Sequence, residues 1–319
     1  VANLELPALG IPPRERGVGC QNGSTDTDNM DQPSDTNNQR PKIPIGIPSF
    51  DNRLRGGIRP GTSILAIGPT GAGQHEFLRS AAIMHGNWQA ESGLFDLTYD
   101  EVPEAVRQPS EVRYITVNDS KSAFRRNMHD LADDEFVYPA LEHINVLSLA
   151  EEMANLGPIK PGAGGGFEYR PRSDQSTEGY EQVFRRFDDL IEAEPGEMVF
   201  LDYLTDFVPL IWKFFDPGDL YFIAQTLCYV VSKSDSVLIA AGDANLVGQQ
   251  RQGLLERSFE AVLDFGWFGE GLRQRRTLTV SKFPEFWRET DTNGRINFDL
   301  EFNRNKFGIS EIEKIPPRR

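Results

Sequence analysis

Residues 63–89 constrain the fold more than any other part of the chain. SILAIG, residues 63–68, is a short apolar run that ends in glycine, which is typical of a buried strand. The next segment, GPTGAGQH (68–75), has the glycine spacing of a phosphate-binding loop, G-x-x-x-x-G-K-[ST]. Apolar residues then recur at helical spacing through residues 74–89. Strand, glycine loop and helix in this order predict an α/β fold built around the loop.

Two positions of this loop depart from the pattern, because Gln74 and His75 stand where lysine and Ser/Thr are expected. The glycines still allow backbone N–H groups to point at an anion at the start of the helix. Gln74, however, brings no charge. His75 offers nitrogen, whereas Mg²⁺ prefers the oxygen of a hydroxyl. Three interpretations remain open: a simple strand-to-helix turn, nucleotide binding without efficient turnover, and a competent ATPase. The candidate binding residues of the loop are Gly68, Gly71, Ala72, Gly73, Gln74 and His75.

The rest of the chain alternates between strand and helix patterns, which predicts a mainly parallel sheet flanked by helices. Apolar runs predict strands at 112–117, 144–149, 198–204 and 236–242. Strand-like segments at 259–268, 275–283 and 296–303 are separated by turn residues, so we expect antiparallel C-terminal strands at one edge. Helical patterns cover 120–132, 181–193 and 218–233, and the glycine-rich segment 155–180 is predicted to be a long surface loop.

Composition separates a tail from a folded part. Residues 1–42 are rich in Ser, Asp, Asn, Gln, Gly and Pro, so we expect a disordered N-terminal tail, followed by a single domain over 43–319. The chain begins with Val1, and Met30 is an alternative start. No leader peptide and no apolar run of about 18 residues is evident, which favours a cytoplasmic protein without a membrane span.

The charge balance excludes a basic surface over the whole chain. The net charge is −15, with 8 lysines and 25 arginines, a bias that favours a salt-adapted haloarchaeal source. The two cysteines and four histidines show no disulfide or metal-ligand spacing, and we expect the histidines to be surface or helix residues. Binding to DNA needs clustered Lys and Arg. The one short basic hairpin, LRQRRTL at 272–278, leaves DNA binding unlikely on these grounds but not excluded.

The segment GIPSFDNRLRGGIRPGTSILAIGPTGAG (46–73) resembles the opening of KaiC/RadA-type RecA-like ATPases. VRYITVNDSKSAFRRNM (112–128) resembles the second strand and helix of that family, and MVFLDYLTDF (198–207) resembles its Walker B strand. The resemblance covers residues 43–310 and is strongest to divergent haloarchaeal, HTR-like members. It implies a RecA-like P-loop core, ATP and Mg²⁺ as cofactors if any are bound, and a protein partner or a homo-oligomer.

The resemblance also implies roles for single residues. Asp202 falls on the Walker B aspartate, which helps to hold Mg²⁺ through water in the family. The paired glutamates of the family fall on Asn118 and Asp119, of which only Asp119 could act as a general base. Lys282 matches the lysine of a K-x-R pair whose arginine position is Pro284, and a solvated strand residue is the alternative. The residues that depart from the family pattern, Gln74, His75, Asn118 and Pro284, thus stand at positions that take part in catalysis in the family.

The pattern as a whole predicts a regulatory or signalling protein with a degenerate P-loop. Such a protein would bind nucleotide weakly or not at all and would hydrolyse little. Two alternatives stay open: an active RecA-family ATPase in which other residues replace the missing ones, and an accessory protein of DNA recombination.

Overall fold

The computed structural model describes residues 41–311, apart from 92, 94, 96–98, 100–105, 163–165, 170–176, 192–193, 215, 217, 270–273, 291–294 and 304–305. The expected tail and the alternative start at Met30 therefore lie outside the described residues, except for the last two positions of the tail. One of these, Lys42, forms a bridge with Val106 and donates a hydrogen bond from Nζ to the carbonyl of Leu54 at 2.6 Å. The division into a tail and one domain remains a prediction.

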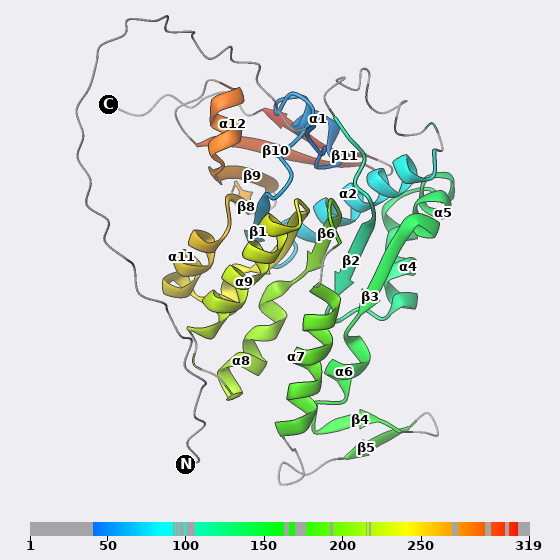
Figure 1. Cartoon of the computed structure of the whole chain (residues 1–319), viewed down its shortest axis with the longest axis vertical. Coiled ribbons are helices and arrows are strands. Elements are labelled where there is room, and N and C mark those ends of the chain that lie inside the picture. Colours follow the sequence, from blue (N-terminus) through cyan, green and yellow to red (C-terminus); the bar gives the residue numbers. More distant parts are fainter. Residues whose placement is uncertain are drawn as a thin grey trace, which may run out of the picture. The chain divides into compact units, whose positions relative to one another are not determined.

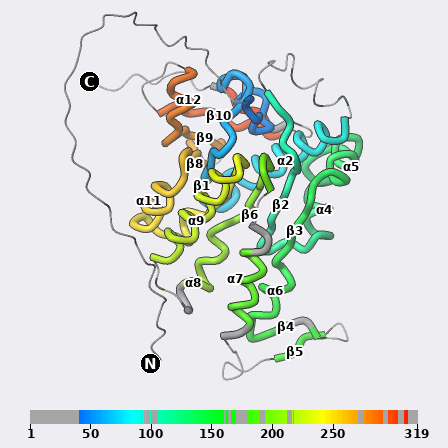
Figure 2. The backbone as a smooth tube through the Cα atoms, viewed as in Figure 1, coloured from blue at the N-terminus to red at the C-terminus, as the bar shows by residue number. Residues whose placement is uncertain are grey.

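Within the described residues, nine strands form one sheet in the order β11-β10-β9-β8-β1-β7-β6-β2-β3 (Figure 1). Figure 2 traces the same path along the backbone. The strands are β1 (Ser63–Gly68), β2 (Val112–Thr116), β3 (Ile144–Ser148), β6 (Met198–Asp202), β7 (Val237–Asp243), β8 (Ala261–Phe268), β9 (Arg275–Lys282), β10 (Ile296–Asn303) and β11 (Lys306–Glu311).

The sheet has a parallel part and an antiparallel part, as predicted. Strands β3, β2, β6, β7, β1 and β8 run parallel to their neighbours. Strands β9, β10 and β11 continue the sheet beyond β8 in antiparallel pairs. The loop-bearing strand β1 is central, with Ile64 paired to Ile239 of β7 on one side and to Ala261 of β8 on the other.

Helices cover both faces of the sheet, which explains why its strands are apolar runs rather than alternating patterns. In β1, Ile64 and Ala66 face one hydrophobic cluster, and Leu65 and Ile67 face the other. The first cluster includes residues of α2 (Gln74–Gln89), α4 (Lys121–Leu131), α5 (Asp134–His143) and α12 (Pro284–Glu289). The second includes residues of α7 (Thr177–Ile191), α8 (Val208–Phe214), α9 (Asp219–Lys233) and α11 (Gln249–Ser258).

The segment predicted to be a long surface loop is partly regular. It contains the antiparallel pair β4 (Ile159–Pro161) and β5 (Phe167–Tyr169), and α7 begins before the predicted loop ends. Ile159, Phe167 and Tyr169 are exposed, so no buried apolar run marked these strands in the sequence. The short elements of the described chain are α1 (Pro48–Asp51), α6 (Ala150–Ala154), η2 (Leu204–Phe207) and α10 (Ala244–Val247).

A search of the described helices for a candidate membrane span finds none of sufficient length and apolar character.

Candidate functional site

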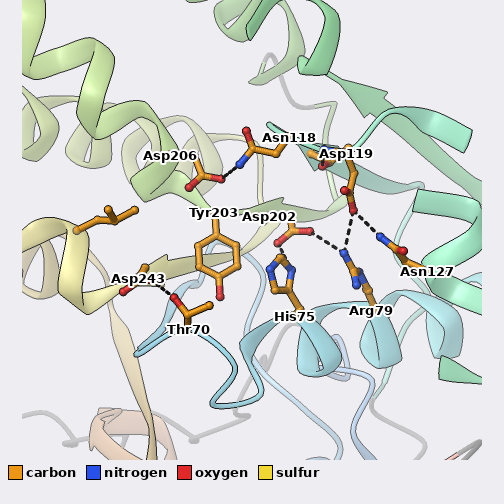
Figure 3. A pocket seen from close by; sticks show the side chains of 12 residues that line it. Thr70, His75, Arg79, Asn118, Asp119, Asn127, Asp202, Tyr203, Asp206 and Asp243 are labelled. Atoms are coloured by element: carbon orange, nitrogen blue, oxygen red, sulfur yellow. Dashed lines mark hydrogen bonds and ion pairs between the residues drawn. The ribbon is translucent and has the colours of Figure 1, made fainter. Parts of the chain in front are cut away.

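A cavity of about 580 Å³ opens where the carboxyl ends of β2, β6 and β7 meet the loop after β1 (Figure 3). Ligands of open α/β sheets bind at this edge, because loops from several parallel strands converge there. The cavity is lined by Thr70, His75, Arg79, Thr116, Asn118, Asp119, Asn127, Asp202, Tyr203, Asp206, Asp243 and Leu246.

The backbone of the loop depends on its glycines. Gly71 has a φ of 80° and Gly73 a φ of 122°, and residues that carry a side chain rarely adopt such backbone conformations. A Cβ atom at Gly73 would lie 2.8 Å from Cζ of Phe302, whereas a Cβ at Gly71 would meet nothing within 4 Å. Gly73 precedes the first residue of α2, so the strand–loop–helix geometry that the motif requires is retained.

Gln74 turns away from the cavity. Gln74 is only 1% exposed, and its side-chain Nε2 donates a hydrogen bond to the carbonyl of Pro69 at 3.3 Å. The same nitrogen lies 2.9 Å from the position that a Cβ on Gly68 would take. Gln74 therefore packs against its own loop and does not extend into the cavity as a phosphate-binding lysine would.

His75 lies against Asp202, the last residue of β6, instead. Its Nδ1 is 2.8 Å from Oδ1 of Asp202, in a close contact that lacks hydrogen-bond geometry. The ring of Tyr203 packs on the imidazole with 4.3 Å between centroids. Tyr203 has a φ of 61°, an uncommon conformation for an aromatic residue, and such conformations often occur at functional sites. Burial, followed by the charge of Asp202, raises the pKa of Tyr203 above its usual value.

Arg79 joins the two predicted aspartates of the site. It lies one helical turn after His75, and its guanidinium is 3.0 Å from Oδ2 of Asp119 and 3.7 Å from Oδ2 of Asp202. Asn127 donates a second hydrogen bond to Oδ2 of Asp119 at 2.8 Å. Both contacts hold the Asp119 carboxylate in a fixed position beside Asp202.

The Asp202 carboxylate is buried and engaged on both oxygens. The residue is 4% exposed. Its Oδ2 accepts a hydrogen bond from the hydroxyl of Tyr114 at 3.0 Å, and its Oδ1 faces His75. Burial raises the pKa of Tyr114 well above its usual value, and so does the neighbouring Asp202.

The opposite wall of the cavity adds two more carboxylates. Asp206 accepts a hydrogen bond from Asn118, and Asp243 accepts one from the hydroxyl of Thr70. Burial raises the pKa of Asp206 to about 7, and the negative charge of Asp202 acts in the same direction. The lining of the cavity is therefore acidic, and the guanidinium of Arg79 and the imidazole of His75 are both placed against aspartates.

The structure thus brings three of the predicted site residues, His75, Asp119 and Asp202, into one cavity, and it turns Gln74 away from them. The predicted loop positions Gly68, Gly71, Ala72 and Gly73 are not among the residues that line the cavity. Arg79 was not predicted; the only sequence signal was its position four residues after His75, on the same face of the helix.

Lys282 is not the solvated strand residue that the sequence allowed. Its Nζ donates a hydrogen bond to the carbonyl of Glu256 at 3.2 Å and another to the carbonyl of Phe259. Lysine satisfies the last carbonyls of a helix well, because those groups have no partner within the helix. Lys282 therefore ties β9 to the end of α11.

All four histidines lie on helices, at positions of the kind that the sequence predicted. His85 lies on α2 but is fully buried, with Nε2 3.0 Å from the carbonyl oxygen of Pro44. Burial lowers the pKa of His85 to about 4. Among the described residues, no three His, Cys, Asp or Glu side chains are grouped so that they could hold a metal ion.

Comparison with known proteins supports the fold. No protein-family model matches the chain, and no curated protein does. Among solved structures, a KaiC-like protein, PH0186 from Pyrococcus horikoshii OT3, superposes with a TM-score of 0.53 at 14% identity, covering 84% of this chain and 98% of its own. The flagellar accessory protein FlaH from Methanocaldococcus jannaschii superposes with a TM-score of 0.51 at 12% identity, covering 82% and 95%. At these identities the likeness shows the fold alone: a mainly parallel central sheet with antiparallel C-terminal strands and flanking helices.

Proposed function

We propose that this chain is a regulatory or signalling protein with a RecA-like core and a degenerate P-loop, which binds nucleotide weakly or not at all and hydrolyses little. The observation that carries the proposal is the position of Gln74. The loop keeps the backbone of an anion site, but the side chain in the lysine position bonds to its own loop at Pro69. The full positive charge that the terminal phosphates of ATP require is therefore missing at this position.

The charges in the cavity support weak binding of nucleotide. Four aspartates line it, and its one permanently charged cation, the guanidinium of Arg79, already faces Asp119 and Asp202. A triphosphate would bring further negative charge close to Asp206 and Asp243. Repulsion between like charges a few ångströms apart is about 1 kcal/mol even in water and larger in a partly buried site.

A protein partner or a second copy of the chain belongs to the proposal. Phe222 and Tyr229 are two turns apart on α9, and they are 61% and 63% exposed. Residues at this spacing lie on the same helix face. Exposed apolar side chains that gather on one face are typical of interaction surfaces. The acidic, arginine-rich composition supports our further proposal of a cytoplasmic protein from a salt-adapted, haloarchaeal source of the HTR-like kind.

The two alternatives have less support. An ATPase would need a cation directed at the phosphates, and the guanidinium of Arg79 is directed at aspartates. A role in DNA recombination would need the basic hairpin to be free. Arg275 pairs with Asp299 at 2.6 Å and Arg276 with Glu76 at 3.0 Å, while residues 270–273 lie outside the described residues. A gel-shift assay with single-stranded DNA tests the second alternative, and we expect no shift.

A nucleotide titration at high salt tests the proposal. We expect weak or undetectable binding of a fluorescent ATP analogue and no phosphate release above background. Gln74→Lys restores the missing charge and should tighten binding at least about ten-fold, which is about 1.4 kcal/mol. Gln225→Lys, on the exposed face of α9, adds the same charge away from the cavity and should change nothing. Rapid phosphate release by the wild type that is lost in Asp202→Asn would contradict the proposal.

A further inference from the structure

The RecA-like fold implies Mg²⁺ beside the Walker B aspartate, but the residues around Asp202 do not fit that ion. Mg²⁺ takes six oxygen ligands in octahedral geometry and usually keeps several waters. Asp202 is 4% exposed, and both of its oxygens have protein neighbours: Tyr114 donates to Oδ2 at 3.0 Å, and His75 Nδ1 lies 2.8 Å from Oδ1. A hydrated ion would have to displace the imidazole first.

The position that normally supplies the hydroxyl ligand holds a nitrogen base instead. His75 is held over Asp202 by Tyr203, whose ring packs on the imidazole at 4.3 Å between centroids. Displacing His75 would therefore also disrupt this ring contact. Imidazole nitrogen is in any case a poor ligand for Mg²⁺.

The guanidinium of Arg79 adds a permanent positive charge at the same place. It is 3.7 Å from Oδ2 of Asp202 and 3.0 Å from Oδ2 of Asp119, and its side chain is 15% exposed. Arginine remains protonated at all physiological pH values. A divalent cation at Asp202 would face this fixed charge at short range in a partly buried site, where screening by water is weak.

From these contacts we propose that Arg79, as a fixed counter-charge, and His75, which covers Oδ1, together take the place of the divalent cation at Asp202, so that ligand binding by this cavity is independent of Mg²⁺. The part of this inference that concerns nucleotide rests on the proposed function. The part that concerns the metal alone does not, because it follows from the contacts of Asp202.

The metal arm uses Mn²⁺, whose free form gives an electron paramagnetic resonance signal that is lost on binding. The wild type should leave this signal unchanged. The double variant His75→Thr with Arg79→Met removes the imidazole beside Oδ1 and the guanidinium beside Oδ2 of Asp202, keeps the hydrogen bond from Tyr114, and restores a hydroxyl. It should therefore bind Mn²⁺ at least about ten-fold more tightly. Arg185→Met is the matched control, because its side chain is 81% exposed on α7 and lies away from the cavity.

Folding of each variant is checked by circular dichroism. If the double variant does not fold, His75→Thr alone serves, since it removes the closest neighbour of Asp202 and should still gain Mn²⁺ affinity. Wild-type protein that binds Mn²⁺ at a site abolished by Asp202→Asn would overturn the inference. A folded variant that binds Mn²⁺ no better than the wild type would overturn it too.

The nucleotide arm compares binding of the fluorescent ATP analogue in Mg²⁺ and in EDTA, and we expect affinities that agree within about two-fold, or 0.4 kcal/mol. Binding that requires Mg²⁺ but releases no phosphate would overturn the inference and leave the proposed function intact. Binding in EDTA that is followed by rapid phosphate release would overturn the proposed function and leave the inference intact. If no nucleotide binds, the Mn²⁺ result decides alone.

Discussion

Two glycines of the phosphate loop provide a matched test of how that loop is held. Gly71 and Gly73 both have positive φ, at 80° and 122°, but their surroundings differ. A Cβ on Gly71 would meet nothing within 4 Å. A Cβ on Gly73 would lie 2.8 Å from Cζ of Phe302 and 3.1 Å from Cδ1 of Leu300. Alanine at the two positions therefore separates backbone strain from steric overlap.

The magnitudes follow from these two terms. Positive φ costs an alanine roughly 1–2 kcal/mol, and this is the whole expected effect of Gly71→Ala. Gly73→Ala adds overlap with the side chains of β10, and overpacking of this kind typically costs about 1–3 kcal/mol. We therefore expect a total loss of roughly 2–5 kcal/mol for Gly73→Ala. The gain from a less flexible unfolded chain is similar for both variants and cancels in the comparison.

Urea denaturation followed by tryptophan fluorescence measures both losses, with an unchanged m-value as the check that unfolding remains comparable. The double variant Gly73→Ala with Phe302→Leu removes the closest overlap, so it should lose less stability than the sum of its single changes. Equal losses for Gly71→Ala and Gly73→Ala would refute the reasoning, because they would show that β10 does not press on the loop.

Two further predictions concern stability. Glu91 follows α2 with a φ of 49°, where glycine has no steric penalty, so Glu91→Gly should raise the free energy of unfolding by about 0.5–1 kcal/mol. The control Glu181→Gly, at an exposed position inside α7, should lower the free energy of unfolding by about 1 kcal/mol. A change of the same sign in both variants would contradict the prediction. The pKa of Asp206 is raised from 3.8 to about 7 in the folded protein, so the folded state binds more protons than the unfolded state between about pH 4 and pH 7, and stability falls as pH rises through this range. Asp206→Asn removes this contribution and should flatten the pH dependence of the urea midpoint; identical slopes for the two proteins would exclude Asp206 as its source.

The central strands could be predicted because burial on both faces requires continuous apolar runs. SILAIG and the run at 237–243 carry that signal, and both are strands of the parallel part. The strands β4 and β5 could not be found in this way, since three of their apolar side chains are exposed. Helix α12 begins with Pro284. The sequence marks this position only as the one where the family's K-x-R pair has its arginine, and it does not predict a helix there.

The site was predictable only in part. His75 and Asp202 were identified from motif positions, and they lie in one cavity. The role of Arg79 depends on Asp119 and Asp202 lying close together. Asp119 follows β2 and Asp202 ends β6, and these two strands are neighbours in the sheet but not in the chain. The inward turn of Gln74 depends on a side-chain rotamer, which no spacing in the sequence determines.

The central position of β1 has a consequence for the nascent chain. Its hydrogen-bonding partners β7 and β8 begin at Val237 and Ala261, long after Ser63 has left the ribosome. Such non-local pairing makes folding slow, because the conformational entropy of a long loop is lost before the contacts between its ends form and compensate for that loss. A translation product that stops before Ala261 would leave one edge of β1 unpaired, and unpaired apolar edges promote aggregation. The strand that leads into the phosphate loop therefore gains its second neighbour only after Ala261 and the rest of β8 have been synthesised.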